Sequence, residues 1–210
     1  MVMSFSSFFT EQARKPAGVF GRMVMSIVFD RGNAFLNGLV YDLMSVQEND
    51  RIIEIGFGTG KLISKIAKNI DSGLIEGVDF SSTMVSIAQK RNKNNIAEGK
   101  VKIVEGNFDE ISYEKNRFTK ACSVNTLYFW DRPELTARKI AEILMPDGKL
   151  LLAFEDIGQL EQRKLNQEVF RLYTKDEVRN LLVDAGFSKN VSIVSKRREK
   201  LLFHCIVAKK

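Results

Sequence analysis

The stretch RIIEIGFGTGKLI, Arg51–Ile63, places Gly56, Gly58 and Gly60 directly after an apolar run and follows them with Lys61. Glycine-rich turns of this kind bring the backbone close to nucleotides, because glycine has no side chain to collide with a ligand and adopts positive φ angles easily. The glycine spacing therefore suggests three candidate ligands: a phosphate group, a dinucleotide, or a nucleoside without phosphate.

The first two ligands fit the spacing poorly. A Walker phosphate loop needs G-x-x-x-x-G-K-[ST], and counting back from Gly60 puts Ile55 at the first glycine and Leu62 at the hydroxyl residue. A dinucleotide fingerprint needs G-x-G-x-x-G, whereas the third glycine here comes one position early. A nicotinamide oxidoreductase stays open as an alternative, because Asp79 would suit ribose hydroxyls in either class. Lys61 is interpreted as an exposed residue of a first helical turn.

The elements that must position this turn alternate between strand and helix from residue 51 onward. Alternation of this kind indicates βαβ units and a mostly parallel sheet with helices on both faces. The strand candidates are Arg51–Ile55, Leu74–Asp79, Val101–Glu105, Thr119–Asn125 and Lys149–Glu155. Helices are expected over Thr59–Lys68, from caps at Ser81 and Ser82 to about Arg91, and from Pro133 with Ala137, Ile140, Ala141 and Leu144 on one face.

The C-terminal end breaks the alternation. Thr174 and Glu177 have the spacing of a capping box, which opens a helix that Gly186 is placed to end. Two strand patterns follow, Val191–Lys196 and Leu201–Ala208, separated by the charged turn RREK. So short a connection makes these two strands antiparallel.

Two segments lie outside this core. We predict a helical cap over residues 1–48 and a domain over residues 49–210, which together form a single structural unit. The buried candidates of the N-terminal helices are Met23, Ile27, Leu36, Leu39, Leu43 and Met44. The long connection Ile157–Tyr173 is expected to be a substrate loop or lid, with a solvated helical linker as the other interpretation.

Composition places few limits on the function. The chain has 210 residues, 44% hydrophobic and 28% charged, which is ordinary for one globular domain, and its formal net charge of +6 permits an acidic or nucleic-acid partner without requiring one. No signal peptide or membrane span is evident, so we predict a cytoplasmic protein. The sequence does not predict its oligomeric state. Cys122 and Cys205 are expected as buried free thiols, and no metal site is expected. The single histidine, His204, is interpreted as a core or edge residue rather than a base.

Five segments in order resemble one known family. The heptad EIGFGTG resembles the E/D-x-G-x-G-x-G first motif of class I S-adenosylmethionine (SAM)-dependent methyltransferases. The segments GVDFS, EGNFDEIS, FTKACSVNTLYFW and ILMPDGKLLLAF resemble the ends of that family's second to fourth strands and the stretch through its fifth. The resemblance covers about residues 48–210. It implies a Rossmann-like, seven-stranded, mostly parallel sheet whose last strand is antiparallel between two parallel neighbours.

The resemblance also implies SAM as cofactor and S-adenosylhomocysteine as product. It places Asp79 on the ribose hydroxyls, Phe80 against the adenine face and Asn107 near the adenine amino group. Many members carry aspartate at the position of Asn107, and an amide oxygen can likewise accept a hydrogen bond from the adenine amine. The full predicted cofactor set is Glu54, Gly56, Phe57, Gly58, Gly60, Asp79, Phe80, Met84, Gly106, Asn107, Phe108, Asn125 and Thr126.

The acceptor side is less determined by the sequence. The candidates are Tyr128, Trp130, Asp131 and Glu155, which follow the fourth and fifth strands, and an interpretation as loop and capping residues stays open. Methyl transfer is an in-line displacement that alignment and exclusion of water promote, and it needs a general base only if the acceptor must lose a proton. No residue stands out as that base.

Absent motifs narrow the acceptor class. Neither the [DNS]-P-P-[YF] motif of amino-directed nucleic-acid methyltransferases nor a Pro-Cys pair is present, and SVNTLYFW is similar to small-molecule methyltransferases of the ubiquinone/menaquinone-biosynthesis-like group. We therefore predict methyl transfer to an unidentified small molecule. The alternatives are an RNA or protein methyltransferase, in which basic residues of Lys90–Lys102 and Lys196–Lys200 touch phosphates, and a SAM-binding module without catalysis.

Overall fold

A computed structural model describes residues 33–163 and 170–210. Its single sheet has the strand order β3-β2-β1-β4-β5-β7-β6. The strands are β1 (Arg51–Ile55), β2 (Leu74–Asp79), β3 (Val101–Glu105), β4 (Phe118–Val124), β5 (Leu144–Glu155), β6 (Ser192–Arg198) and β7 (Leu201–Lys209). The described helices are α3 (Ala34–Met44), α4 (Lys61–Ala67), α5 (Ser82–Arg91), α6 (Lys93–Ala97), the short 3-10 helix η1 (Leu127–Phe129), α7 (Pro133–Ile143), α8 (Ile157–Gln162) and α9 (Lys175–Asp184).

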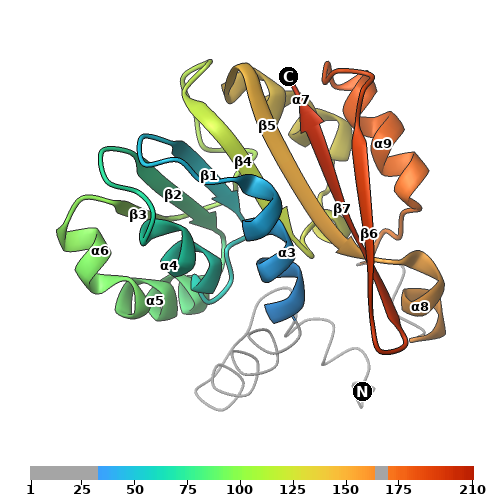
Figure 1. The fold of residues 1–210 in the computed structure, drawn as a ribbon, viewed down its shortest axis with the longest axis horizontal. Coiled ribbons are helices and arrows are strands. Elements are labelled where there is room, and N and C mark those ends of the chain that lie inside the picture. The colour runs from blue at the N-terminus through green and yellow to red at the C-terminus, as the bar shows by residue number, and fades with distance from the viewer. Residues whose placement is uncertain (1–32, 164–169) are drawn as a thin grey trace.

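The predicted fold class is confirmed. Strands β1 to β5 pair in parallel, and β7 lies antiparallel between β5 and β6 (Figure 1). The strand order reverses between β1 and β4: β2 and β3 follow on one side of this pair, and β5, β7 and β6 follow on the other. In open α/β sheets a crevice forms at this switch point, outside the carboxyl ends of the strands.

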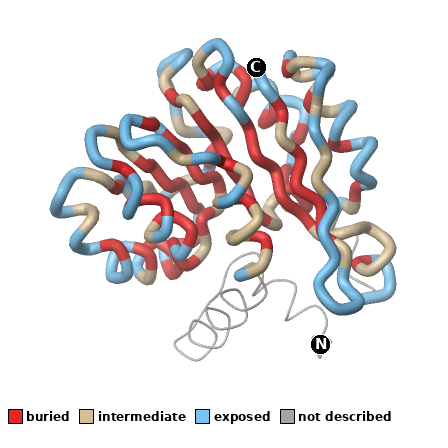
Figure 2. Tube along the Cα trace, viewed as in Figure 1, coloured by how far each residue is buried: buried red, intermediate tan, exposed pale blue. Residues whose placement is uncertain are grey.

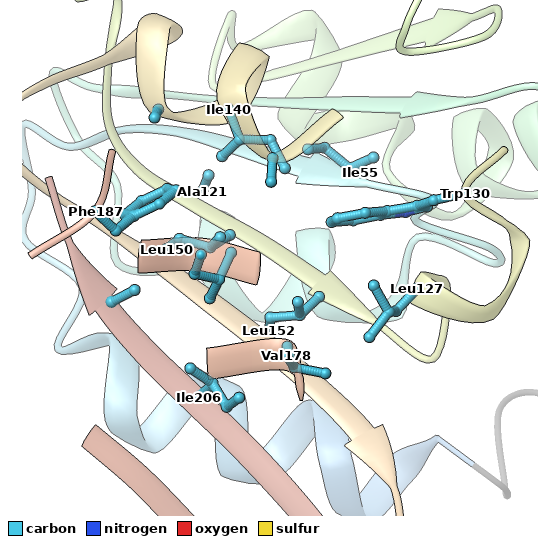
Figure 3. Close-up of a cluster of buried hydrophobic side chains, with 14 of the residues drawn as sticks. Ile55, Ala121, Leu127, Trp130, Ile140, Leu150, Leu152, Val178, Phe187 and Ile206 are labelled. Carbon is cyan, nitrogen blue, oxygen red and sulfur yellow. The ribbon is translucent and has the colours of Figure 1, made fainter. Parts of the chain in front are cut away.

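Helices cover both faces of the sheet, because successive strand residues point to opposite sides. In β5, Leu150, Leu152 and Phe154 join one core with helices α7 and α9, whereas Leu151 and Ala153 join the other with α3, α4 and α5. Strands β1, β2, β4, β5 and β7 are therefore buried along most of their length, whereas exposed residues gather on the helices, the turns and the edge strand β6 (Figure 2). Figure 3 shows the core on the α7 side, where Trp130 reaches from the segment after β4 toward Ile55.

The connection between α7 and β5 differs from the prediction. Leu144 was assigned to the helical face, but the helix ends at Ile143 and Leu144 begins the strand. The register on β4 shifts between Phe118 and Lys120, so the residues MPDG form an irregularity within β5 rather than a turn before it. Asp147 has a φ of 64° there, a left-handed conformation that aspartate tolerates.

The other predicted elements agree closely with the structure. The capping box at Thr174 and Glu177 is present, and Ser81 caps α5 by accepting from the Met84 amide. Helix α4 is shorter than predicted, and α6 was not predicted. The hairpin turn consists of Glu199 and Lys200, because the two arginines of RREK belong to β6.

Helix α3 is the described part of the predicted N-terminal cap, and it packs directly on the sheet. Leu36 and Met44 are fully buried in the core with α4, whereas Leu39 and Leu43 are partly buried. Met23 and Ile27 lie outside the described residues. In the predicted loop Ile157–Tyr173, the described part contains α8, which Asp156 caps by accepting from the Gly158 amide. No described helix is long and apolar enough to cross a membrane.

Candidate active site

A cleft opens where the parallel strands end, and residues after β1, β2, β3 and β4 line it together with α3. Its empty space, open solvent included, is about 1140 Å³. The described lining residues are Asn33, Asn37, Glu54, Ile55, Gly56, Phe57, Gly58, Thr59, Val78, Asp79, Phe80, Ser81, Met84, Gly106, Asn107, Phe108, Asp109, Val124, Asn125, Thr126, Phe129, Trp130, Asp131 and Thr136.

The glycine turn after β1 needs its glycines for different reasons. Gly56, Gly58 and Gly60 have φ values of 70°, 55° and 68°, a region that other residues rarely adopt. A Cβ at Gly56 would lie 2.4 Å from Thr126, and one at Gly60 would lie 2.7 Å from Ala88 of α5. A Cβ at Gly58 would meet no protein atom within 4 Å. Gly58 thus leaves open space for a ligand, whereas Gly60 allows the turn to approach α5.

Asp79 ends β2 beside this turn. Its two carboxylate oxygens accept hydrogen bonds from the amides of Gly58 and Ser81, both at 2.9 Å. The side chain is buried, and burial raises the pKa of Asp79 to about 6 even though both amides act in the opposite direction. The carboxylate therefore fixes the glycine turn relative to β2, and its remaining lone pairs can accept from ribose hydroxyls.

Glu54 lies on the neighbouring strand, deeper in the cleft. It is 2% exposed, and its Oε2 atom has no hydrogen-bond partner. Burial, and next the charge of Asp79, raise the pKa of Glu54 to about 8. A buried carboxyl without a cation beside it favours a positively charged or hydrogen-bond-donating ligand, because such a ligand supplies the partner that the protein lacks.

The residues after β2 and β3 form the other end of the cleft. Phe80 is 41% exposed, which is unusual for a large apolar side chain and leaves its ring accessible to a ligand. The side chain of Asn107 accepts a hydrogen bond from the Asp109 amide and donates one to the Glu110 carboxylate. Both of its polar atoms are therefore bonded within the local turn. The Thr136 hydroxyl holds the Asp109 carboxylate at 2.8 Å, which brings α7 to this end of the cleft.

A hydrogen-bond chain forms the opposite wall. Asn125 has a φ of 55° at the end of β4, and its amide nitrogen donates to Asn33 Oδ1 at 2.7 Å. Tyr128 lies behind it and accepts from the Glu155 amide at 2.7 Å. Burial holds the pKa of the Tyr128 hydroxyl well above its usual value, so the phenol stays protonated at neutral pH. Left-handed asparagine at such a position is a form of backbone strain that is common at functional sites.

The structure brings most of the predicted site residues together, but not all. Gly60, Tyr128 and Glu155 do not line the cleft: Gly60 faces α5, Tyr128 is buried behind the wall, and Glu155 pairs with Arg163 at 2.6 Å. Every other predicted cofactor residue lines the cleft, as do Trp130 and Asp131. Further residues line the cleft that were not predicted as site residues: Asn33, Asn37, Ile55, Thr59, Val78, Ser81, Asp109, Val124, Phe129 and Thr136.

His204 is buried outside the cleft, as its mid-strand position indicated. Its ring contacts Ser195 at Nδ1 and Asp156 at Nε2, at 2.8 and 2.9 Å. The two cysteines are also buried and are not joined by a disulfide.

The charges in the cleft are opposite in sign to the net charge of the chain. Glu54, Asp79, Asp109 and Asp131 line it, and none of its described lining residues is lysine, arginine or histidine. The chain as a whole carries a formal charge of +6. A phosphate-bearing ligand would lack a cationic partner among these residues, whereas a cationic nucleoside would meet carboxylates. The fold and cleft thus define a Rossmann-like protein whose ligand site suits a cationic nucleoside.

Comparison with known proteins identifies the class. A family model described as a methyltransferase domain matches residues 53–152. The Bacillus subtilis protein YrhH is 29% identical over 125 residues, which are 59% of this chain and 68% of that protein. YdaC of the same organism, described as an uncharacterized methyltransferase, is 25% identical over 191 residues, 90% of this chain and 98% of that protein.

The same class appears among proteins with named substrates and known structures. The ubiquinone/menaquinone biosynthesis C-methyltransferase UbiE of Pseudomonas putida is 22% identical over 152 residues, 68% of this chain and 59% of that protein. Phosphoethanolamine N-methyltransferase 2 of Haemonchus contortus, solved with SAM, has a TM-score of 0.78 at 15% identity, over all of this chain and 60% of its own. Fold, ordered motifs and relatives together identify the protein as a class I SAM-dependent methyltransferase, with SAM as its cofactor.

Proposed function

We propose that the protein transfers the methyl group of SAM to a small molecule that carries no negative charge. The observation that supports this proposal is the acidic lining of the cleft, which has four carboxyl groups and no cation among its described residues, although Glu54, with a pKa of about 8, is mostly protonated at neutral pH. Nucleic-acid and phosphorylated acceptors bring negative charge, which such a lining disfavours. Two buried free cysteines are compatible with a reducing compartment, and we include a cytoplasmic location in the proposal.

Within this proposal, each wall of the cleft has its own task. Glu54 and Asp79 receive the cationic and hydroxyl-bearing parts of SAM, because both are buried acceptors and Glu54 Oε2 has no protein partner. Phe80 packs on the adenine with its exposed ring. The Asn107 side chain bonds within its own turn, and the Asp109 carboxylate lies at the same end of the cleft. Adenine recognition is therefore shared between Asn107 and Asp109.

The acceptor side is assigned to Asn33, Asn37, Asn125, Trp130 and Asp131. Their amides, ring and carboxylate can orient a small uncharged acceptor. SAM, when bound, would supply a methyl group on a positively charged sulfur, so that a bond from the acceptor to the methyl carbon forms as the carbon–sulfur bond breaks and S-adenosylhomocysteine leaves. The chain contributes alignment and a partly apolar enclosure that excludes water. Tyr128 is excluded as the base in this proposal, because its phenol is buried and its pKa is raised.

Relatives with printed substrates support a small-molecule acceptor. UbiE is named for ubiquinone and menaquinone biosynthesis, and the Haemonchus contortus enzyme is named for phosphoethanolamine. The second of these acceptors carries a phosphate, which the carboxylate-lined cleft disfavours here. We therefore favour an acceptor without a phosphate group or other negative charge.

The test uses SAM with a radioactive methyl group and a cell extract treated with charcoal and nuclease or left untreated. After reaction, radioactivity is measured separately in a solvent-extractable small-molecule fraction, in RNA and in protein. The proposal expects label in the small-molecule fraction, and Asp79→Ala removes it. Label in RNA or protein would support the macromolecular alternative. Binding of SAM without transfer in any fraction would support a module that binds SAM without catalysis.

A further inference from the structure

The hairpin of β6 and β7 carries four cations and one anion in five positions: Lys196, Arg197 and Arg198 end β6, and Glu199 and Lys200 form the turn. The four cations share two features. All four are exposed, and none of their side chains forms an ion pair or hydrogen bond with a described residue. Leu201 follows them and is 38% exposed, one of the few large apolar side chains that the described surface exposes to this extent. We call the four cations and Leu201 the basic tip. It combines unpaired positive charge with an exposed aliphatic side chain.

The basic tip lies at the edge of the sheet where the cleft opens. Register pairs Glu155, the last residue of β5, with Phe203, so the hairpin continues past the end of β5 to Arg198 and Leu201. Figure 1 shows this turn projecting beyond the sheet beside α8. The carboxylates that follow β5 do not neutralise it, because Glu155 pairs with Arg163 and Asp156 bonds to His204.

Protection of an open sheet edge does not explain the position of these charges. Edge strands often carry lysine along their length, which prevents pairing with another chain. Strand β6 instead begins Ser192, Ile193, Val194, Ser195 and has its cations only at the turn end. In a strand, Lys196 and Arg198 point to one side and Arg197 to the other, so both sides of the tip are cationic.

We propose that the basic tip docks the protein on an anionic lipid surface, with the edge that bears the cleft facing the membrane. A convex turn with cations around it and a leucine at its end suits a surface of anionic headgroups above hydrocarbon. Single-stranded nucleic acid would favour an exposed aromatic ring for base stacking, and Phe203, the aromatic residue of the described tip region, is buried. Docking there would bring lipid-dissolved molecules close to the cleft.

The experiment is co-sedimentation of the full chain with vesicles of phosphatidylcholine alone or of phosphatidylcholine with phosphatidylglycerol. We expect binding to the anionic vesicles that weakens as salt is added. The double variant Arg197→Glu and Arg198→Glu should bind at least roughly thirtyfold more weakly, since each cation near an anionic membrane contributes about a factor of five. Leu201→Ser should reduce the binding that persists at high salt.

A matched control reverses two cations of the other basic segment, Lys90 and Lys93, which are exposed on α5 and α6. Lys90→Glu with Lys93→Glu should leave vesicle binding within roughly a factor of five, the contribution of a single cation. Circular dichroism and SAM titration check that each variant is folded. The proposal fails if the wild type does not distinguish anionic from neutral vesicles, or if both double variants lose binding equally. It also fails if the tip binds RNA in gel shifts and vesicles do not compete.

Discussion

Gly58 and Gly60 share a left-handed backbone for different physical reasons. A side chain at Gly60 would collide with α5, so this glycine serves packing, whereas Gly58 faces open space in the cleft. The sequence motif predicted a cofactor-binding role for both glycines, because it does not indicate which of them faces a neighbouring helix. The distinction required the position of Ala88, which lies far along the chain.

Gly58→Ala tests the ligand role of this position. Alanine in the left-handed region should cost about 1–2 kcal/mol of stability, and its methyl group should reduce SAM affinity at least tenfold by occupying the cleft. Gly99→Ala is the matched control, since Gly99 also has positive φ and open space around it but does not line the cleft. Urea denaturation and SAM titration measure the two effects. Equal SAM affinities for the two variants would contradict the assignment.

Glu54 and Asp79 predict opposite pH trends for folding and for binding. Their pKa values are raised in the folded state, to about 8 and about 6, so the folded state binds protons that the unfolded state releases. The free energy of unfolding without ligand should therefore fall by on the order of a few kcal/mol as pH rises from about 4 to 8. SAM affinity should rise over the upper part of this window, because a cationic ligand favours ionised carboxyls.

Glu54→Gln separates these two trends. The amide does not titrate, so the variant should lose the larger part of the pH dependence of unfolding and should gain stability above pH 7. Its SAM affinity should be lower and should depend on pH only through Asp79. Urea denaturation and calorimetry at several pH values measure both. A wild type whose stability rises steadily from pH 4 to 8 would show that burial does not dominate these carboxyls.

At the scale of elements, the wall that joins η1 to the end of β5 depends on Tyr128. Its hydroxyl accepts from the partly buried Glu155 amide, and Phe at this position removes that hydrogen bond. Tyr128→Phe should cost about 1–3 kcal/mol of stability while SAM affinity stays unchanged. Tyr41→Phe, on the surface of α3, should cost less. If Tyr128→Phe were fully stable yet unable to transfer methyl groups, Tyr128 would be the base after all.

The elements themselves were largely predictable, and the exceptions have physical causes. Short β-rich runs predicted the bounds of β1, β2 and β3 to the residue. The start of β5 was missed because a proline and a glycine usually end a strand, whereas here MPDG forms an irregularity within it. Asn33 and Asn37 were missed because one turn of α3 brings them to a cleft that β1 and β4 define later in the chain.

At the scale of the whole molecule, charge is separated between the cleft and its surroundings. The described lining is acidic, although the chain is basic overall, and the basic tip lies at the same edge as the cleft. The sequence gives the net charge but not this separation, because the four carboxylates come from four different segments. Raising the ionic strength should therefore weaken vesicle docking more than SAM binding, since the cleft carboxylates Glu54 and Asp79 are buried from salt.

The most direct test of the central claim is a calorimetric titration of SAM into the wild type, Asp79→Ala and Asp71→Ala at pH 8. Asp71 is exposed and does not line the cleft, so it controls for the loss of a surface carboxylate. The account predicts one SAM site in the wild type and in Asp71→Ala, and a loss of at least tenfold in affinity for Asp79→Ala. Absence of SAM binding by the wild type, or unchanged affinity for folded Asp79→Ala, would contradict it.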